Sequence, residues 1–197
     1  MTRVGAAAGQ ATGAGLLDRA ISYAIGVAGD VAPELLPRPT PCREWDLEML
    51  LRHANESLTA LLEGLDAGRI GLEPAAEDEP AADLARVFRE RARRLLSAWS
   101  GAGRRRSVIY IADCPLAASA MEGAGALEIA VHGWDISQAC GHRRPIPRAL
   151  AAELLAVAEL LVPETGRHPL FAAPVAMPAG AGPSDRLAAF LGRTRQA

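Results

Sequence analysis

Hydrophobic residues recur at helical spacing in five stretches of the chain, and this pattern predicts an all-α fold. The first stretch, residues 16–31, predicts a helix that ends before Pro33 or soon after it. The second follows Asp46, a preferred N-cap residue type, and runs to a break at Gly68. Further helices are expected over residues 81–100, 123–140 and 147–161, with a short amphipathic piece at 184–192.

The segment at residues 107–112, within the run SVIYIADCP, breaks this helical pattern. It is short and rich in β-branched residues, so it is either an extended crossover or a single strand packed on the helices, and the sequence does not decide between them. We expect residues 1–14 to be flexible and residues 15–197 to form one helical-bundle domain that includes a Pro- and Gly-rich tail.

Composition and charge narrow the classes of function. Half of the residues are hydrophobic but only 4% are aromatic, which favours closely packed helices. The net charge of -2, spread along the chain, offers no basic face for nucleic acid. Three cysteines without CxxC spacing fit a reducing cytoplasm, and we expect neither a signal peptide nor a membrane span. Both a monomer and a homodimer remain open.

The candidate chemistry lies on two of the predicted helices. Glu128 and His132 are four residues apart and therefore project from the same helix face, one turn from each other. His53 lies beside the apolar stripe of another helix, where its imidazole can point into the bundle. Two imidazoles and one carboxylate leave a position open on a bound zinc ion. The alternative is a chance pair of Glu128 and His132, with His53 as an ordinary hydrogen-bonded core residue.

Neighbouring residues invite further roles. Asp135 lies three residues past His132 and could orient a ligand imidazole or a bound water, although an Asp that accepts a hydrogen bond from the backbone or an Arg is equally expected. Trp134 is turned away from this face and is expected to be a packing residue. Cys42 lacks an identifiable acid–base partner. Cys114, expected in a loop, and Cys140, expected off the metal face, are interpreted as ordinary residues.

Two motifs carry a resemblance to a known family. The stretch ALEIAVHGWDISQACG resembles the Glu-x-x-x-His-Gly-Trp-Asp signature of the mycothiol-dependent maleylpyruvate isomerase N-terminal domain and its actinobacterial metal-binding relatives, within the DinB-like superfamily. The stretch TPCREWDLEMLLRHANES resembles the family's entry into its second helix. The resemblance spans about residues 16–193. It implies a DinB-like antiparallel four-helix bundle with a long crossover, and His53, Glu128 and His132 as metal ligands.

The resemblance also implies a kind of chemistry. It favours a metal-dependent thiol transferase or isomerase that acts on a small-molecule substrate, with zinc as the expected metal, nickel, iron or manganese as alternatives, and mycothiol as a co-substrate. The isomerases proper have a further domain that supplies an arginine to the site, and this chain is expected to lack that domain. Two other interpretations stay open: a metal-assisted lyase, hydrolase or cyclase of a natural-product pathway, and a non-catalytic metal-binding protein.

Overall fold

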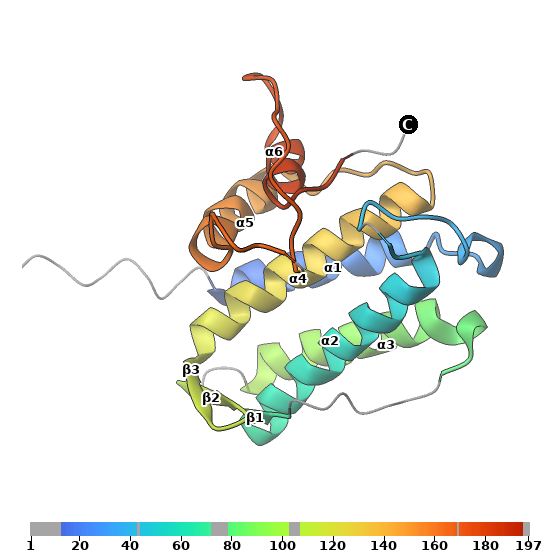
Figure 1. The fold of residues 1–197 in the computed structure, drawn as a ribbon. Coiled ribbons are helices and arrows are strands. Elements are labelled where there is room, and N and C mark those ends of the chain that lie inside the picture. Colours follow the sequence, from blue (N-terminus) through green and yellow to red (C-terminus); the bar gives the residue numbers. More distant parts are fainter. Residues whose placement is uncertain (1–12, 43, 72–78, 103–106, 169, 195–197) are drawn as a thin grey trace, which may run out of the picture.

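The structure is a computed structural model that describes residues 13–42, 44–71, 79–102, 107–168 and 170–194. Six helices and three short strands follow one another along these residues (Figure 1). The elements are α1 (Gly13–Ala28), α2 (Leu47–Ala67), β1 (Arg69–Ile70), α3 (Leu84–Ala102), β2 (Val108–Ile111), β3 (Cys114–Ala117), α4 (Ala118–Ala139), α5 (Arg148–Leu161) and α6 (Pro183–Phe190), with 3₁₀ turns at Pro33–Leu35 and Ala81–Asp83.

Helices α1 to α4 form a bundle. α1 packs most extensively against α4, α2 packs against α3, and the pairs α1–α3 and α2–α4 complete the ring of contacts (Figure 1). α1 and α2 therefore occupy diagonal corners, as do α3 and α4, so the chain crosses the bundle between the members of each pair. α5 packs against α4, and α6 packs against α5. The expectation of an all-α bundle with short extra helices near the C-terminus is confirmed.

α4 is the most deeply enclosed helix. Every residue from Gly125 to Ala139 is buried except Glu128, as expected for a helix that is apolar on nearly all sides. Gly133 permits the close approach of α1, because a Cβ at this position would lie 3.2 Å from Tyr23 Cε1 and 3.3 Å from Ala24 Cα. Small residues thus bring α1 and α4 together and fix the helix that carries Glu128 and His132.

Local signals in the sequence set the ends of α2. The Asp46 carboxylate accepts a hydrogen bond from the Met49 backbone N–H at 2.9 Å, and Gly68 ends the helix in the left-handed conformation with φ of 73°. Both ends agree with the prediction. α1 also ends before Pro33, at Ala28, as predicted. The start of α4 was placed wrongly, because the helix begins at Ala118, well before residue 123.

The segment at residues 107–112 belongs to a β-hairpin. β2 pairs with β3 in antiparallel register, with Val108 opposite Ala117, and β1 joins β2 in parallel register, with Arg69 opposite Tyr110. Neither a bare crossover nor a single strand describes this small sheet, which joins the end of α2 to the start of α4. Cys114, expected in a loop, is the first residue of β3.

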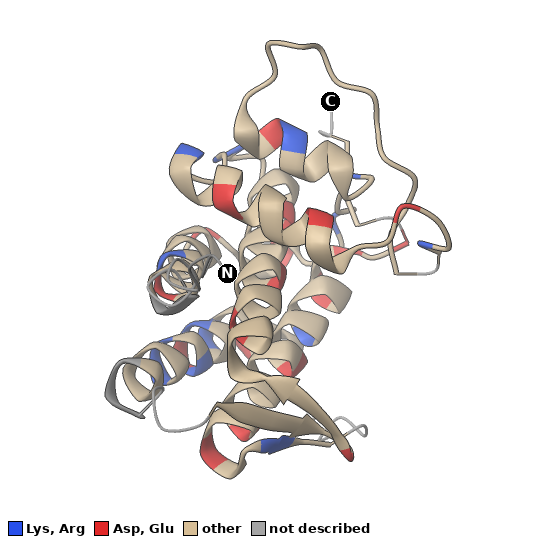
Figure 2. Ribbon diagram, turned by 90° about the vertical axis from the view of Figure 1, so that its left-hand side faces the viewer, with Lys and Arg blue, Asp and Glu red and all other residues tan. Residues whose placement is uncertain are grey.

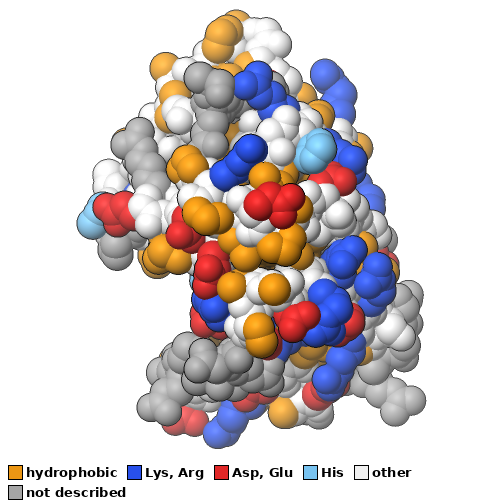
Figure 3. Space-filling model, turned by 90° about the vertical axis from the view of Figure 1, so that its right-hand side faces the viewer, with side chains coloured by type: hydrophobic (Ala, Val, Ile, Leu, Met, Phe, Trp, Pro, Cys, Tyr) orange, Lys and Arg blue, Asp and Glu red, His pale blue; other side chains and the backbone are white. Residues whose placement is uncertain are grey.

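The outer faces of the helices carry charges of both signs (Figure 2). On the face drawn in Figure 3, acidic, basic and apolar side chains are interspersed. None of the helices in the described part of the chain is long and apolar enough to cross a membrane. The expectation of a flexible start at residues 1–14 lies outside the described residues as far as residue 12, and α1 begins at Gly13.

Candidate metal centre

The bundle brings His53 of α2 together with Glu128 and His132 of α4. The Glu128 Oε1 atom lies 2.7 Å from His53 Nε2 and 3.2 Å from His132 Nε2. One ligand atom from each residue lies within 4.8 Å of the other two. A metal ion bound by imidazole and carboxylate at about 2.0–2.2 Å fits between atoms at such separations after small movements of the side chains.

His132 is held in place by a contact on the side of its ring that faces away from Glu128. Its Nδ1 lies 3.1 Å from Asp135 Oδ2, which directs Nε2 toward Glu128 and His53. Asp135 is fully buried and accepts hydrogen bonds from Arg193 Nε on both oxygens, at 3.0 and 2.9 Å. The Asp135 carboxylate thus contacts an imidazole and an arginine at the same time, which are both kinds of contact considered for it from the sequence. A carboxylate behind a ligand imidazole is the usual support of a zinc-binding histidine.

The end of α6 places Arg193 in the bundle. Gly192 follows the helix in the left-handed conformation with φ of 77°, and Arg193 N–H donates to Ala188 O at 2.9 Å. A Cβ at residue 192 would lie within 2.6–2.8 Å of Ala172, so glycine is required for this turn. Sequence reasoning did not single out Arg193. The Gly-Arg pair at 192–193 signals the turn but not what the arginine meets.

His53 is held by fewer groups. Its ring lies 4.8 Å from the Trp45 ring and 5.1 Å from the His132 ring, measured between centroids. Ser57, one turn further along α2, donates its hydroxyl to Glu128 Oε1 at 2.9 Å. Sequence reasoning assigned neither Trp45 nor Ser57 to the site. The spacing of Ser57 from His53 on α2 was the available signal for that serine.

The charges of the cluster stabilise one another when no metal is bound. Burial by itself raises the pKa of Glu128, but the charges and hydrogen bonds of His132 and His53 outweigh burial and hold the pKa well below its usual range. Burial lowers the pKa of His132, yet Glu128 and Asp135 raise it to about 9. An imidazolium beside a carboxylate therefore occupies the place where a cation can bind.

The other singled-out residues lie outside the cluster. Burial raises the pKa of the Cys42 thiol, which does not favour a nucleophilic role, although Arg193, Asp135 and Glu128 all act on this thiol electrostatically. Cys140 is buried and burial raises its pKa to about 11, while Cys114 is exposed. Trp134 is buried in the core, as expected for a packing residue.

The donor set matches that of a catalytic rather than a structural metal site. Two imidazoles and one carboxylate provide three ligands, which leaves a position for water or substrate on a four-coordinate ion. His53 and Glu128 are about one-third exposed, so this position can be reached from solvent, whereas His132 is buried. The fold and the cluster together define a helical-bundle protein with a candidate metal centre between α2 and α4.

Comparison with known proteins places the chain in a family. Residues 17–137 match the mycothiol maleylpyruvate isomerase N-terminal domain, and the chain belongs to this family. It is similar to two uncharacterized proteins of Mycobacterium tuberculosis, MT0763 of strain CDC 1551 / Oshkosh and Rv0738 of strain H37Rv. Each is 28% identical over 170 residues, covering 84% of this chain and 88% of the relative. No solved structure gives a significant match.

Proposed function

We propose that this chain is a metal-dependent enzyme that joins a thiol, with mycothiol as the proposed co-substrate, to an electrophilic small molecule. The observation that carries the proposal is the meeting of His53 Nε2, Glu128 Oε1 and His132 Nε2, supported by membership of a family named for a mycothiol-dependent reaction. In this proposal the three residues hold a divalent ion. Zinc is the expected ion, and nickel, iron and manganese are the alternatives. The identity of the ion follows the donor set and metal availability.

A divalent ion of this kind lowers the pKa of a thiol or water and polarises a carbonyl. The protein's contribution is to present the ligands in place. The Asp135 carboxylate would accept a hydrogen bond from the Nδ1–H of His132 and so leave Nε2 free for the ion. Ser57 donates to the Glu128 carboxylate and limits its rotation. In the proposed addition, the thiol sulfur would bond to the electrophilic carbon of an activated double bond, and the π electrons of that bond would take up a proton from solvent in place of the proton that the thiol gives up, so that no group leaves.

Metal content and turnover test the proposal. Wild-type protein is expected to contain about one equivalent of metal by elemental analysis, whereas His53→Ala and His132→Ala are expected to lose most of it because each removes one of three ligands. His142→Ala is the matched control, since His142 is exposed and lies outside the cluster. Circular dichroism of all variants separates loss of metal from loss of fold.

The same samples decide the kind of chemistry. Turnover of a general electrophile that requires both the metal and mycothiol supports thiol transfer. Metal with turnover but no thiol dependence contradicts the thiol step and supports a lyase, hydrolase or cyclase instead. Bound metal without turnover of any class of electrophile leaves a metal-binding protein that is not an enzyme. A wild type that stays metal-free in metal-replete buffer overturns the proposal.

A further inference from the structure

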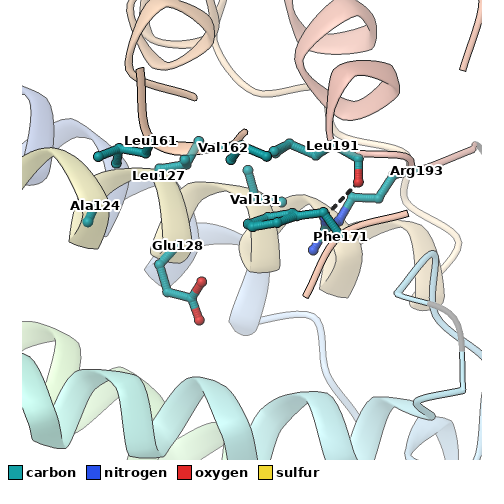
Figure 4. Close-up of a pocket in the computed structure, with 9 residues that line it drawn as sticks. All are labelled: Ala124, Leu127, Glu128, Val131, Leu161, Val162, Phe171, Leu191 and Arg193. Atoms are coloured by element: carbon teal, nitrogen blue, oxygen red, sulfur yellow. Dashed lines mark hydrogen bonds between the residues drawn. The ribbon is translucent and has the colours of Figure 1, made fainter. Parts of the chain in front are cut away.

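A pocket of about 280 Å³ adjoins the candidate metal centre on the side of α4 that faces α5 and the tail (Figure 4). Glu128 belongs to both the pocket and the cluster and is the link between them. In Figure 4 the Glu128 carboxylate points toward α2, while Leu127 and Val131 of the same helix lie on the side of Leu161 and Val162. A molecule that reaches the metal past Glu128 can therefore extend into this pocket.

The walls of the pocket are almost entirely apolar. Seven of the nine lining side chains are aliphatic or aromatic, and Phe171 of the tail covers the pocket from one side. Ala124, at the start of the lining stretch of α4, is exposed and marks the mouth. Binding of a hydrocarbon group against apolar walls is favourable because it removes apolar surface from water. Burial of a polar group without a hydrogen-bond partner against the same walls costs free energy.

Both charged residues of the lining already have partners within the protein. Arg193 is bonded through Nε to both oxygens of the buried Asp135, and its Nη1 lies 3.5 Å from Leu191 O. Glu128 is bonded to His53, Ser57 and His132 in the metal-free protein. Because these charges are balanced by neighbouring side chains, the pocket does not require a ligand charge of either sign.

We propose that this pocket binds the uncharged hydrocarbon part of the electrophilic substrate. The inference rests on the proposed function and names the substrate class of the same site. At about 30 Å³ per water molecule, the volume fits a group of roughly ten non-hydrogen atoms, such as a medium-length alkyl chain or a substituted phenyl ring. The reactive carbon lies at the Glu128 end of this group, next to the metal, and the hydrocarbon part extends toward Phe171.

A series of straight-chain alkyl hydroxamic acids tests this assignment on the metal-loaded protein. The hydroxamate head group binds divalent metals, and each added methylene is expected to tighten binding about fourfold until the pocket is full, when measured by calorimetry. Ala124→Phe should abolish this dependence on chain length while acetohydroxamate still binds. Ala152→Phe is the matched control, because Ala152 is an exposed alanine of α5 outside the pocket. Acetohydroxamate binding with no dependence on chain length overturns the inference.

Two further series separate this inference from the metal and from a role for Arg193. Straight-chain alcohols need no metal, so affinity that rises with chain length in chelator-treated protein supports the pocket even where hydroxamates fail and the proposed metal centre is wrong. No such rise in either series overturns the pocket. Hydroxamates that end in a carboxylate should bind more weakly than those that end in a methyl group. Tighter binding of the carboxylates would show that Arg193 binds an anion and would overturn the proposal that the pocket binds an uncharged group.

Discussion

The two histidines of the candidate metal centre differ in how firmly the protein holds them. The His132 side chain is 7% exposed and rests on Asp135, which Arg193 holds in turn. The His53 side chain is 37% exposed and contacts Glu128 and the Trp45 ring. The α4 side of the centre is thus fixed by a buried polar network, while the α2 side can adjust. We therefore expect substitutions around His132 to disturb the cluster more than substitutions around His53.

Removal of Asp135 is expected to have the largest effect, because it breaks the rigid side. Asp135→Ala leaves Arg193 buried without its anion, and such a change costs about 3–5 kcal/mol of unfolding free energy. Metal affinity should fall about 10- to 100-fold with the loss of support for His132. Urea denaturation and competition with a chelator measure the two effects. Asp135→Asn, which keeps the shape and one acceptor, should lie between the two proteins.

An Asp135→Ala protein as stable as the wild type would contradict the buried network as the source of rigidity. Unchanged metal affinity at reduced stability would show instead that His132 needs no orienting partner.

The stability of the metal-free protein should depend on pH through His132. Its pKa is raised from 6.5 to about 9 in the folded state, so the folded protein binds this proton more tightly than the unfolded chain. The resulting stabilisation is complete below pH 6.5 and is lost as the pH rises to about 9, with an upper bound of about 3 kcal/mol. Urea denaturation at pH 6 to 9 with chelator present measures it.

His132→Gln is the control for this pH dependence and should flatten the curve over the same range. If wild type and His132→Gln lost stability in parallel between pH 6.5 and 9, the raised pKa would belong to another group.

Loss of Trp45 should affect the adjustable side to a smaller degree. Trp45→Ala removes the ring that packs on His53, a contact worth about 0.5–1.5 kcal/mol, and metal affinity is expected to fall about three- to tenfold. Trp45→Phe keeps a ring and should stay near the wild type. Chelator competition measures both variants. Because the Trp45 ring also lies 6.2 Å from the His132 ring, measured between centroids, a loss as large as that of Asp135→Ala would show that Trp45 supports both imidazoles.

Ser57→Ala is expected to have the smallest effect. The variant removes one of three polar contacts to Glu128 Oε1, but this carboxylate is partly exposed and water can replace the lost hydroxyl, so the net contribution is about 1 kcal/mol or less. Metal affinity should fall less than about fivefold and the fold should be unchanged by circular dichroism. Ser57→Thr, which keeps the hydroxyl, is the matched control. Equal affinities of the alanine variant and the wild type would show that the two histidines alone position Glu128.

Features set by local signals could be predicted, and features set by distant contacts could not. The ends of α2 follow from Asp46 and Gly68, and the pairing of Glu128 with His132 follows from their helical spacing. The parallel pairing of Arg69 with Tyr110 joins residues far apart along the chain, and two residues carry too little pattern to mark a strand. Arg193 reaches Asp135 across 58 positions, so its role depends on how the tail folds back.

Part of the pocket wall lies outside the stretch of chain that carries the candidate metal ligands, which bears on how such proteins diverge. The family match ends at residue 137 and contains all three candidate ligands, whereas Leu161, Phe171 and Leu191 of the pocket lie beyond it. Substitutions after α4 can therefore reshape this pocket while the three candidate ligands stay unchanged. The ligand preference of such a protein can change through substitutions after α4. We therefore expect related chains to differ most in this segment.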